Sequence, residues 1–227
     1  MKTFIYFLLI TLNIGFCNAH IFHHSNIQSL EFEIYRNAKY AGTHLINFKW
    51  NKNGNVEVKN TIEFGIKKFG ITLYKYQSKG TEIYNKSGKL VSFKSITDDN
   101  GKSKFCDIVL KKNKYKINGT KYNGFFEKLF LISSYWNHDI LTVPIQVSGI
   151  TCKIQDQKVR FLKEEKLTVL NQTFDTKVFD IRGKELKTQI WFDKKTNMIV
   201  HQELYKKGKW EYKLKGYDLN KGYELNK

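Results

Sequence analysis

Residues 44–58 read HLINFKWNKNGNVEV, and this stretch decides the fold class. Four residues spaced two apart in its first half share one strand face: His44, Ile46, Phe48 and Trp50. Such period-two alternation is typical of a strand with one buried face. The Asn53-Gly54 pair that follows predicts a tight hairpin turn into a second strand.

The same alternation continues outward from this hairpin in both directions. It recurs at residues 30–34, 62–66 and 210–214. Further turn signals stand at 86–88, 100–101, 118–119, 193–197 and 207–208. Turns about 8–15 residues apart indicate consecutive antiparallel hairpins. Because a long open sheet exposes its edges, we expect a mainly β fold, a long antiparallel meander curled into a half-barrel or barrel.

One segment breaks the strand pattern. Between Phe125 and Leu141 the alternation fails, and Pro144 follows shortly afterwards. We therefore expect one short helix here, because proline commonly lies just beyond a helix end. Ser134–Asn137 is expected to cap this helix, with Trp136 packed beneath the sheet.

The N-terminus has the pattern of a cleaved signal peptide over residues 1–19. Lys2 precedes an apolar run, and Cys17-Asn18-Ala19 offers a small-residue cleavage site before His20. The run is shorter than the roughly 20 residues that span a bilayer, although an uncleaved anchor remains an alternative. We expect residues 20–29 to form a flexible leader and residues 30–227 a single β-rich domain.

The chain is strongly basic, with a net charge of +18 from 39 basic and 21 acidic residues. Only Arg36, Arg160 and Arg182 are arginines, and recognition of bases and phosphates favours the arginine side chain. We therefore expect no nucleic-acid partner. The lysines alternate along strands as solvated faces do, and peripheral contact with an anionic membrane stays open.

Two cysteines remain after the predicted cleavage site, Cys106 and Cys152. An even number of cysteines in an exported domain favours a disulfide, and we expect these two to pair. The alternative is a pair of separate buried thiols, because nothing in the sequence brings the two positions together.

Five short motifs in order resemble an exported bacterial family catalogued only as a domain of unknown function (number six-one-three-four). The resemblance covers about residues 30–215. It implies a periplasmic protein of a Gram-negative bacterium and brings no activity or catalytic residues. One departure is Ala38, where a turn asparagine or glycine is expected. The motifs are Tyr35-Arg36-Asn37 with Gly42-Thr43-His44, Gly70–Tyr76, Thr97–Gly101, Ser134–Asn137 and Trp191–Asp193.

Few patterns indicate catalysis or a cofactor. His138-Asp139 lies near Ser133 and Ser134, but no Gly-x-Ser-x-Gly elbow is present. The sequence also has no phosphate-binding glycine loop, dinucleotide fingerprint or zinc-spaced set of cysteines and histidines. We therefore predict no catalytic residues, no cofactor and no metal, and an enzyme is the third-ranked class.

The remaining candidate is a ligand site on the apolar strand face. A histidine among apolar residues can orient a ligand head if the face lines a cavity. By loose analogy, a curled sheet with a helix against it is similar to lipoprotein carriers, although fold alone does not give function. We expect an apolar or lipid-like ligand, and the alternative is a structural or interaction protein of the cell envelope. The predicted ligand-binding residues are His44, Phe48, Tyr74, Tyr76, Trp136 and Asn137.

Overall fold

A computed structural model describes residues 24–220 of the protein. The predicted signal peptide and the first residues of the leader lie outside these described residues. The described chain contains sixteen strands and a short 3-10 helix, η2. The strands are β1 (Ile27–Arg36), β2 (Lys39–Trp50), β3 (Val56–Lys68), β4 (Ile71–Tyr84), β5 (Leu90–Asp99), β6 (Lys102–Lys111), β7 (Lys114–Gly119), β8 (Asn123–Phe126), β9 (Leu131–Ile132), β10 (Ile145–Val147), β11 (Ile154–Asp156), β12 (Lys158–Val169), β13 (Gln172–Arg182), β14 (Lys187–Asp193), β15 (Ile199–Tyr205) and β16 (Lys209–Leu219), and η2 spans His138–Leu141.

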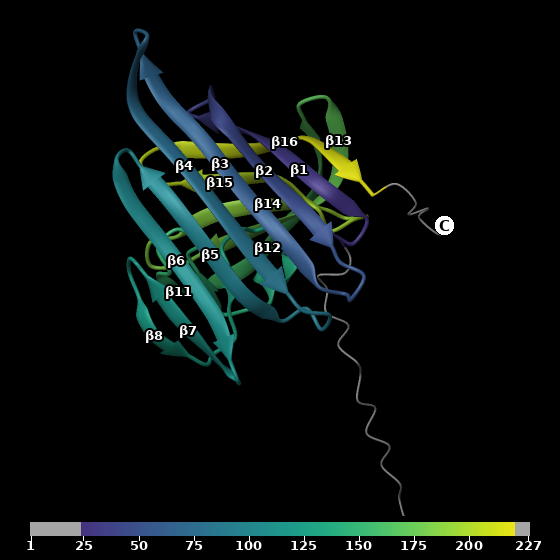
Figure 1. The fold of residues 1–227 in the computed structure, drawn as a ribbon. Coiled ribbons are helices and arrows are strands. Elements are labelled where there is room, and N and C mark those ends of the chain that lie inside the picture. The colour runs from purple at the N-terminus through teal and green to yellow at the C-terminus, as the bar shows by residue number, and fades with distance from the viewer. Residues whose placement is uncertain (1–23, 221–227) are drawn as a thin grey trace, which may run out of the picture.

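Thirteen strands form one antiparallel sheet, in the order β12-β13-β14-β15-β16-β1-β2-β3-β4-β5-β6-β7-β8. Because β1 pairs with β16, the first and last strands of the chain are neighbours inside the sheet. The sheet curls until its β12–β16 half lies behind its β1–β6 half (Figure 1). Its edges, β8 and β12, do not pair, so the predicted curled meander is confirmed as an open one.

The segment between the two edge strands packs against the inside of the curl. It contains a three-stranded sheet of β9, β10 and β11. The helix η2, whose N-cap is Asn137, lies between β9 and β10 in the chain. The helix is shorter than the predicted segment 125–141, because Tyr135 has φ 60°, which no α-helix accommodates. Within residues 24–220 no helix has the length and apolar character that crossing a bilayer requires.

Strong curvature brings distant strands together on the inner face. The rings of Phe64 on β3 and Trp210 on β16 are 4.8 Å apart. Three strand spacings in a flat sheet would separate them by about 14 Å. Gly42 lies between them on β2, where an added Cβ would stand 2.5 Å from the Cα of Phe64. The absence of a side chain at Gly42 therefore permits β2 and β3 to approach each other closely at this point.

The hairpin turns follow the sequence signals closely. Gly54, Gly88 and Gly101 all have positive φ, as the predicted turns require. In the β1–β2 turn Ala38 has φ 63°, a conformation that costs a non-glycine residue about 1–2 kcal/mol. The unusual alanine therefore sits at a position that favours asparagine or glycine.

Cys106 and Cys152 form a disulfide, as predicted. The bond joins β6 to the loop between β10 and β11, and both cysteines are fully buried. It closes a loop with a sequence separation of 46 residues. In the chain-entropy model, such a loop contributes about 4 kcal/mol. The disulfide therefore fastens the inserted segment to the inside of the sheet.

Candidate functional site

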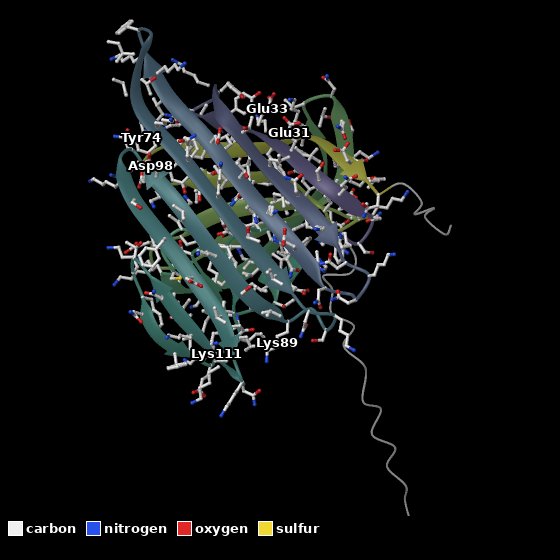
Figure 2. All side chains as sticks on the ribbon, viewed as in Figure 1. Glu31, Glu33, Tyr74, Lys89, Asp98 and Lys111 are labelled. Atoms are coloured by element: carbon white, nitrogen blue, oxygen red, sulfur yellow. A yellow bond between two sulfur atoms is a disulfide. The ribbon has the colours of Figure 1, made fainter. Side chains whose placement is uncertain are left out.

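A cavity of about 890 Å³ lies inside the curled sheet. Its walls come from β2–β5 on one side, from β15 and β16 on the other, and from the inserted segment. It lies toward the end of the sheet that carries the β1–β2, β3–β4, β5–β6 and β15–β16 turns. Figure 2 shows Tyr74 and Asp98 at this end, and Lys89 and Lys111 at the opposite end.

The middle of the cavity is apolar and aromatic. Ile62, Phe64 and Ile66 alternate along β3 and face Tyr212 and Leu204 from the other half of the sheet. The Phe64 ring stacks on Tyr76 with centroids 4.6 Å apart. These side chains give an aliphatic molecule dispersion contacts and few polar partners.

The deep end of the cavity carries a polar cluster of the buried His44 and Glu82 and the half-buried Asn60, which we call the inner cluster. His44 Nε2 lies 3.2 Å from Asn60 Oδ1, and Asn60 Nδ2 donates to Glu82 Oε1 at 3.0 Å. Tyr84 donates its hydroxyl to the other oxygen of Glu82 at 2.6 Å, and Trp136 Nε1 donates to Oε1 at 3.2 Å. Glu82 is thus the common acceptor for side chains from β3, β4 and the inserted segment.

Burial sets the charge state of the inner cluster. It lowers the pKa of His44 to about 4, although the hydrogen bond with Asn60 acts in the opposite direction. His44 is therefore neutral at physiological pH. Burial also raises the pKa of Glu82 above its usual value, against the hydrogen bonds that Tyr84, Trp136 and Asn60 donate to it. Neither group offers a positive charge, so the deep end does not favour an anion.

The rim of the cavity is cationic. Arg36, Lys206 and Lys207 line it from the β1–β2 and β15–β16 turns. The Arg36 guanidinium donates to the Lys207 carbonyl at 2.9 Å and lies 5.4 Å from the ring centre of Trp210. Tyr74 and Lys104 also reach the rim and donate to Asp99. Although partial burial acts to raise it, these two partners hold the pKa of the Asp99 carboxyl below its usual value.

The structure brings three of the six predicted ligand residues to the cavity wall. They are His44, Tyr74 and Tyr76. The other three pack next to the cavity without lining it: Phe48 and Trp136 meet edge to face at 5.2 Å, and Asn137 caps η2.

Two polar residues of the cavity wall, the half-buried Asn60 and the buried Glu82, were not predicted from the sequence. A usable signal was present for Glu82. It alternates with Tyr76, Ser78 and Tyr84 on one face of β4, and all four are buried.

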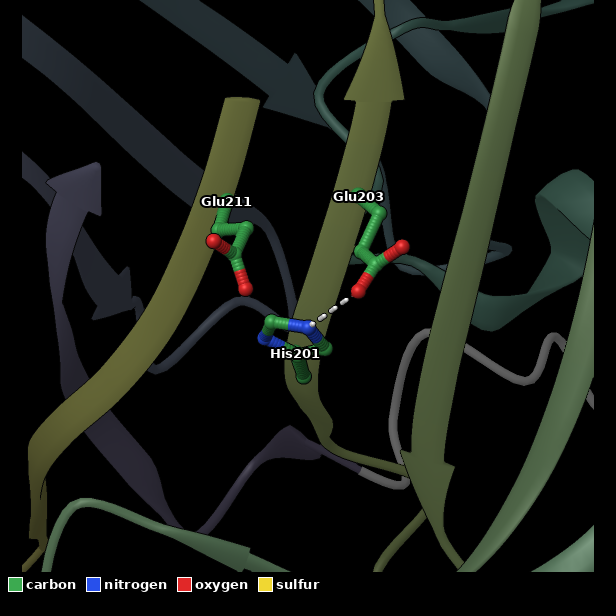
Figure 3. A group of neighbouring side chains, drawn as sticks. All are labelled: His201, Glu203 and Glu211. Atoms are coloured by element: carbon green, nitrogen blue, oxygen red, sulfur yellow. Dashed lines mark hydrogen bonds and ion pairs between the residues drawn. The ribbon is translucent and has the colours of Figure 1, made fainter. Parts of the chain in front are cut away.

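A second polar cluster lies on the outer face of the sheet, formed by His201, Glu203 and Glu211 (Figure 3). We call it the outer cluster. Its ligand-type atoms lie within 4.8 Å of one another. Lys209 Nζ stands 2.7 Å from Glu203 and 3.6 Å from Glu211, and Lys213 Nζ stands 3.7 Å from Glu211, so two ammonium groups balance the two carboxylates. We therefore interpret this cluster as part of a surface ion-pair ladder.

The solved structures support the fold. The chain is similar to a beta-barrel-like protein of domain of unknown function DUF1849 from Brucella abortus, with TM-score 0.63 and 8% identity over 86% of this chain and 98% of that chain. A match to MucB, with TM-score 0.36 and 12% identity, covers 92% of this chain but only 56% of the other, and it supports no further argument. The curated proteins contain no significant match.

The family comparison agrees with the motifs. Four of the five motif regions contribute residues to the cavity lining, among them Arg36, His44, Tyr74, Asp99 and Ser134. The family model for "Domain of unknown function (DUF6134)" matches residues 32–215, which include every strand of the sheet apart from the start of β1 and the end of β16. The chain therefore belongs to the DUF6134 family.

Proposed function

We propose that this protein binds an apolar or amphipathic, lipid-like molecule reversibly in its cavity, without chemical conversion. The observation that carries the proposal is the cavity itself, about 890 Å³ with an aliphatic and aromatic middle. Pockets for small ligands commonly measure 300–1,000 Å³ and are mostly apolar with a few placed polar groups. The inner cluster and the cationic rim supply such polar groups.

The energetics are favourable for a chain-like ligand. Each buried methylene contributes about 0.8 kcal/mol, so about ten of them would contribute roughly 8 kcal/mol. This is of the same order as the cost of association, which is estimated at about 4–15 kcal/mol. A weak to moderate, reversible affinity is therefore expected from the apolar contacts alone.

The charged residues of the cavity indicate how the ligand is oriented in it. An anionic head would meet Glu82 and a neutral His44 at the deep end, but Arg36 and two lysines at the rim. We therefore place the head at the rim and the chain inside. A terminal hydroxyl on the chain could still donate to His44 Nδ1, because Nε2 is the nitrogen that faces Asn60.

Titration of the purified protein with a fluorescent fatty acid at low salt tests this proposal. The matched variants are Ile62→Trp and Glu63→Trp, which lie at adjacent positions on β3. Ile62 lines the cavity, whereas Glu63 is exposed on the other face. We expect Ile62→Trp to weaken binding at least about ten-fold by filling the cavity, and Glu63→Trp to bind as the wild type does.

Thermal denaturation of each variant separates loss of binding from loss of folding. If the folded wild-type protein gives no saturable signal with any acyl or isoprenoid probe, the carrier proposal fails. The protein would then be better regarded as a structural or interaction protein of the envelope.

The place of action is part of the same proposal: export by a cleaved signal peptide to the periplasm. The support is the pattern of residues 1–19 and the disulfide, because disulfides persist in oxidising compartments. N-terminal sequencing of the protein from its own host should find a start at His20 or within two residues of it. A membrane-held form that retains Met1 would contradict this.

A further inference from the structure

The β3–β4 hairpin extends beyond the rest of the sheet (Figure 1). The last residue of β3 that pairs with β2 is Phe64, and the first residue of β4 that pairs with β5 is Tyr76. Within the described chain, residues 65–75 therefore form a two-stranded ribbon with no further strand paired on either side. At its base, Lys75 exchanges hydrogen bonds with Asn100 and Tyr74 donates to Asp99. At about 3.3 Å per residue, the four residues from Phe64 to Lys68 carry the ribbon roughly 13 Å past the sheet.

The end of this ribbon is apolar. Phe69 is 91% exposed, Ile71 66% and Leu73 55%. Phe69 also has φ 49° beside Gly70 at φ 77°, a turn geometry in which asparagine is favoured over a bulky aromatic residue. An isolated hairpin gains little stability from side chains that face only solvent. Local folding therefore does not explain why these three residues are apolar.

The residues behind the apolar tip are basic. Lys67, Lys68 and Lys75 are all exposed on the ribbon, and no acidic residue lies within residues 65–75. An apolar tip followed by lysines matches the profile of a bilayer surface, where acyl chains lie below anionic headgroups. A second protein would have to supply an apolar and acidic surface of its own.

We propose that residues 65–75 dock the protein on the surface of an anionic lipid bilayer, with Phe69, Ile71 and Leu73 inserted below the headgroups. The ribbon also forms part of the cavity rim, since Ile66, Leu73 and Tyr74 line it. Docking therefore brings the mouth of the cavity to the membrane. This inference needs only the ribbon, and it would stand even if the cavity bound no lipid.

Co-sedimentation of the purified protein with vesicles tests the inference. The vesicles contain phosphatidylcholine alone or with one quarter phosphatidylserine. The test variant is Phe69→Asp combined with Ile71→Asp, and the control is Phe125→Asp, an aromatic residue 61% exposed on the edge strand β8. We expect the ribbon variant to lower partitioning onto anionic vesicles at least about ten-fold, and the control less than about two-fold.

Two further measurements keep the test decisive. The ribbon variant should melt as the wild type does and should still bind the fluorescent fatty acid in solution, which separates docking from cavity binding. Phe69→Trp should show a blue-shifted emission with anionic vesicles. Wild-type protein that does not sediment, or a ribbon variant that sediments equally well, would overturn the inference. Loss of a wild-type dimer on ribbon substitution, without vesicle binding, would also overturn it and identify a second copy as the partner.

Discussion

The inner and outer clusters contain the same kinds of residue in opposite surroundings. Each contains a histidine and a glutamate: His44 of β2 is linked to Glu82 of β4 through Asn60, whereas His201 and Glu203 lie on the same strand, β15. In the inner cluster, burial raises the pKa of Glu82, and its hydrogen-bond donors are uncharged side chains. In the outer cluster, Glu203 is surrounded by cationic and hydroxyl donors: although burial acts to raise it, His201, Lys209 and Tyr205 lower the pKa of Glu203 to about 2.

The difference shows that the inner cluster, unlike the outer one, lies in an apolar environment, where burial of a carboxyl costs free energy. Lysines on the same face of the sheet pair with the outer carboxylates and offset their charge. The Glu82 carboxyl lies where an apolar side chain would cost less free energy to bury, and it borders a cavity. Perturbed ionisable groups beside a cavity are candidates for function. This contrast can be tested by changing one cluster at a time.

Removing a carboxyl from each cluster should give the largest difference. Glu82→Ala leaves Asn60, Tyr84 and Trp136 without their acceptor and opens a void, so we expect a loss of about 3–4 kcal/mol in the free energy of unfolding. Glu203→Ala should lower the free energy of unfolding by about 1–2 kcal/mol. Urea denaturation measures both. Glu82→Gln, which keeps an acceptor oxygen, should fall between them, and equal losses at the two sites would refute the contrast.

The pH dependence of stability should separate the clusters next. In the unfolded chain a histidine takes up its proton near pH 6.5, whereas His44 in the fold stays neutral down to about pH 4. The unfolded state therefore binds more protons in this interval, and stability is lost as the pH falls from 6.5 to 4. The full loss in the free energy of unfolding over this interval amounts to about 3 kcal/mol.

His44→Gln provides the control, because it should flatten this part of the curve. The raised pKa of Glu82 works in the opposite direction, since its contribution to stability is lost as the pH rises through the folded pKa. Glu82 is present in both proteins, so their difference reports on His44. Parallel curves for the two proteins between pH 6.5 and 4 would show that His44 titrates normally in the fold.

At more acidic pH the stability of the protein should depend on the outer cluster. The depressed pKa of Glu203 stabilises the fold above its unfolded value of about 4.5, and this contribution is lost as the pH falls toward 2. Allowing for solvent screening, we expect about 1–2 kcal/mol. Glu203→Gln should remove this acid-side slope without altering the slope between pH 6.5 and 4. Thermal melts at closely spaced pH values provide the measurement.

Much of the fold could be predicted because strand alternation depends on local sequence. Leu30, Phe32 and Ile34 face inward as expected, and so do His44 and Ile46. The hairpin tip at Phe69-Gly70 was not predicted, because a phenylalanine in a turn carries no usual turn signal. The ribbon became visible only through the strand register, which shows where the neighbouring strands stop pairing.

The inserted segment could not be predicted for a different reason. Its conformation depends on contacts with residues distant in the sequence: Trp136 donates to Glu82, Tyr135 donates to Gln146, and Cys152 bonds to Cys106. These contacts hold Tyr135 in a left-handed conformation that ends any helix. The inner cluster could not be predicted for the same reason. Asn60 and Glu82 lie on two different strands, and they are recognised as part of a site only once the cavity is known.

The smallest expected effect concerns metal binding, and it tests our interpretation of the outer cluster. His201 has one feature of a metal ligand, because its Nδ1 lies 3.0 Å from the Tyr212 carbonyl and its Nε2 faces Glu203. A divalent cation would have to displace the ammonium group of Lys209, which lies between the carboxylates. We therefore expect zinc to leave the melting temperature of the wild-type protein unchanged within error. Lys209→Ala removes the competing charge, so zinc should stabilise this variant measurably, and His201→Gln in the same background should abolish the effect. Stabilisation of the wild-type protein by micromolar zinc would instead identify a metal site on the outer face, since a ligand that binds only the folded state stabilises it by RT ln(1 + [L]/Kd).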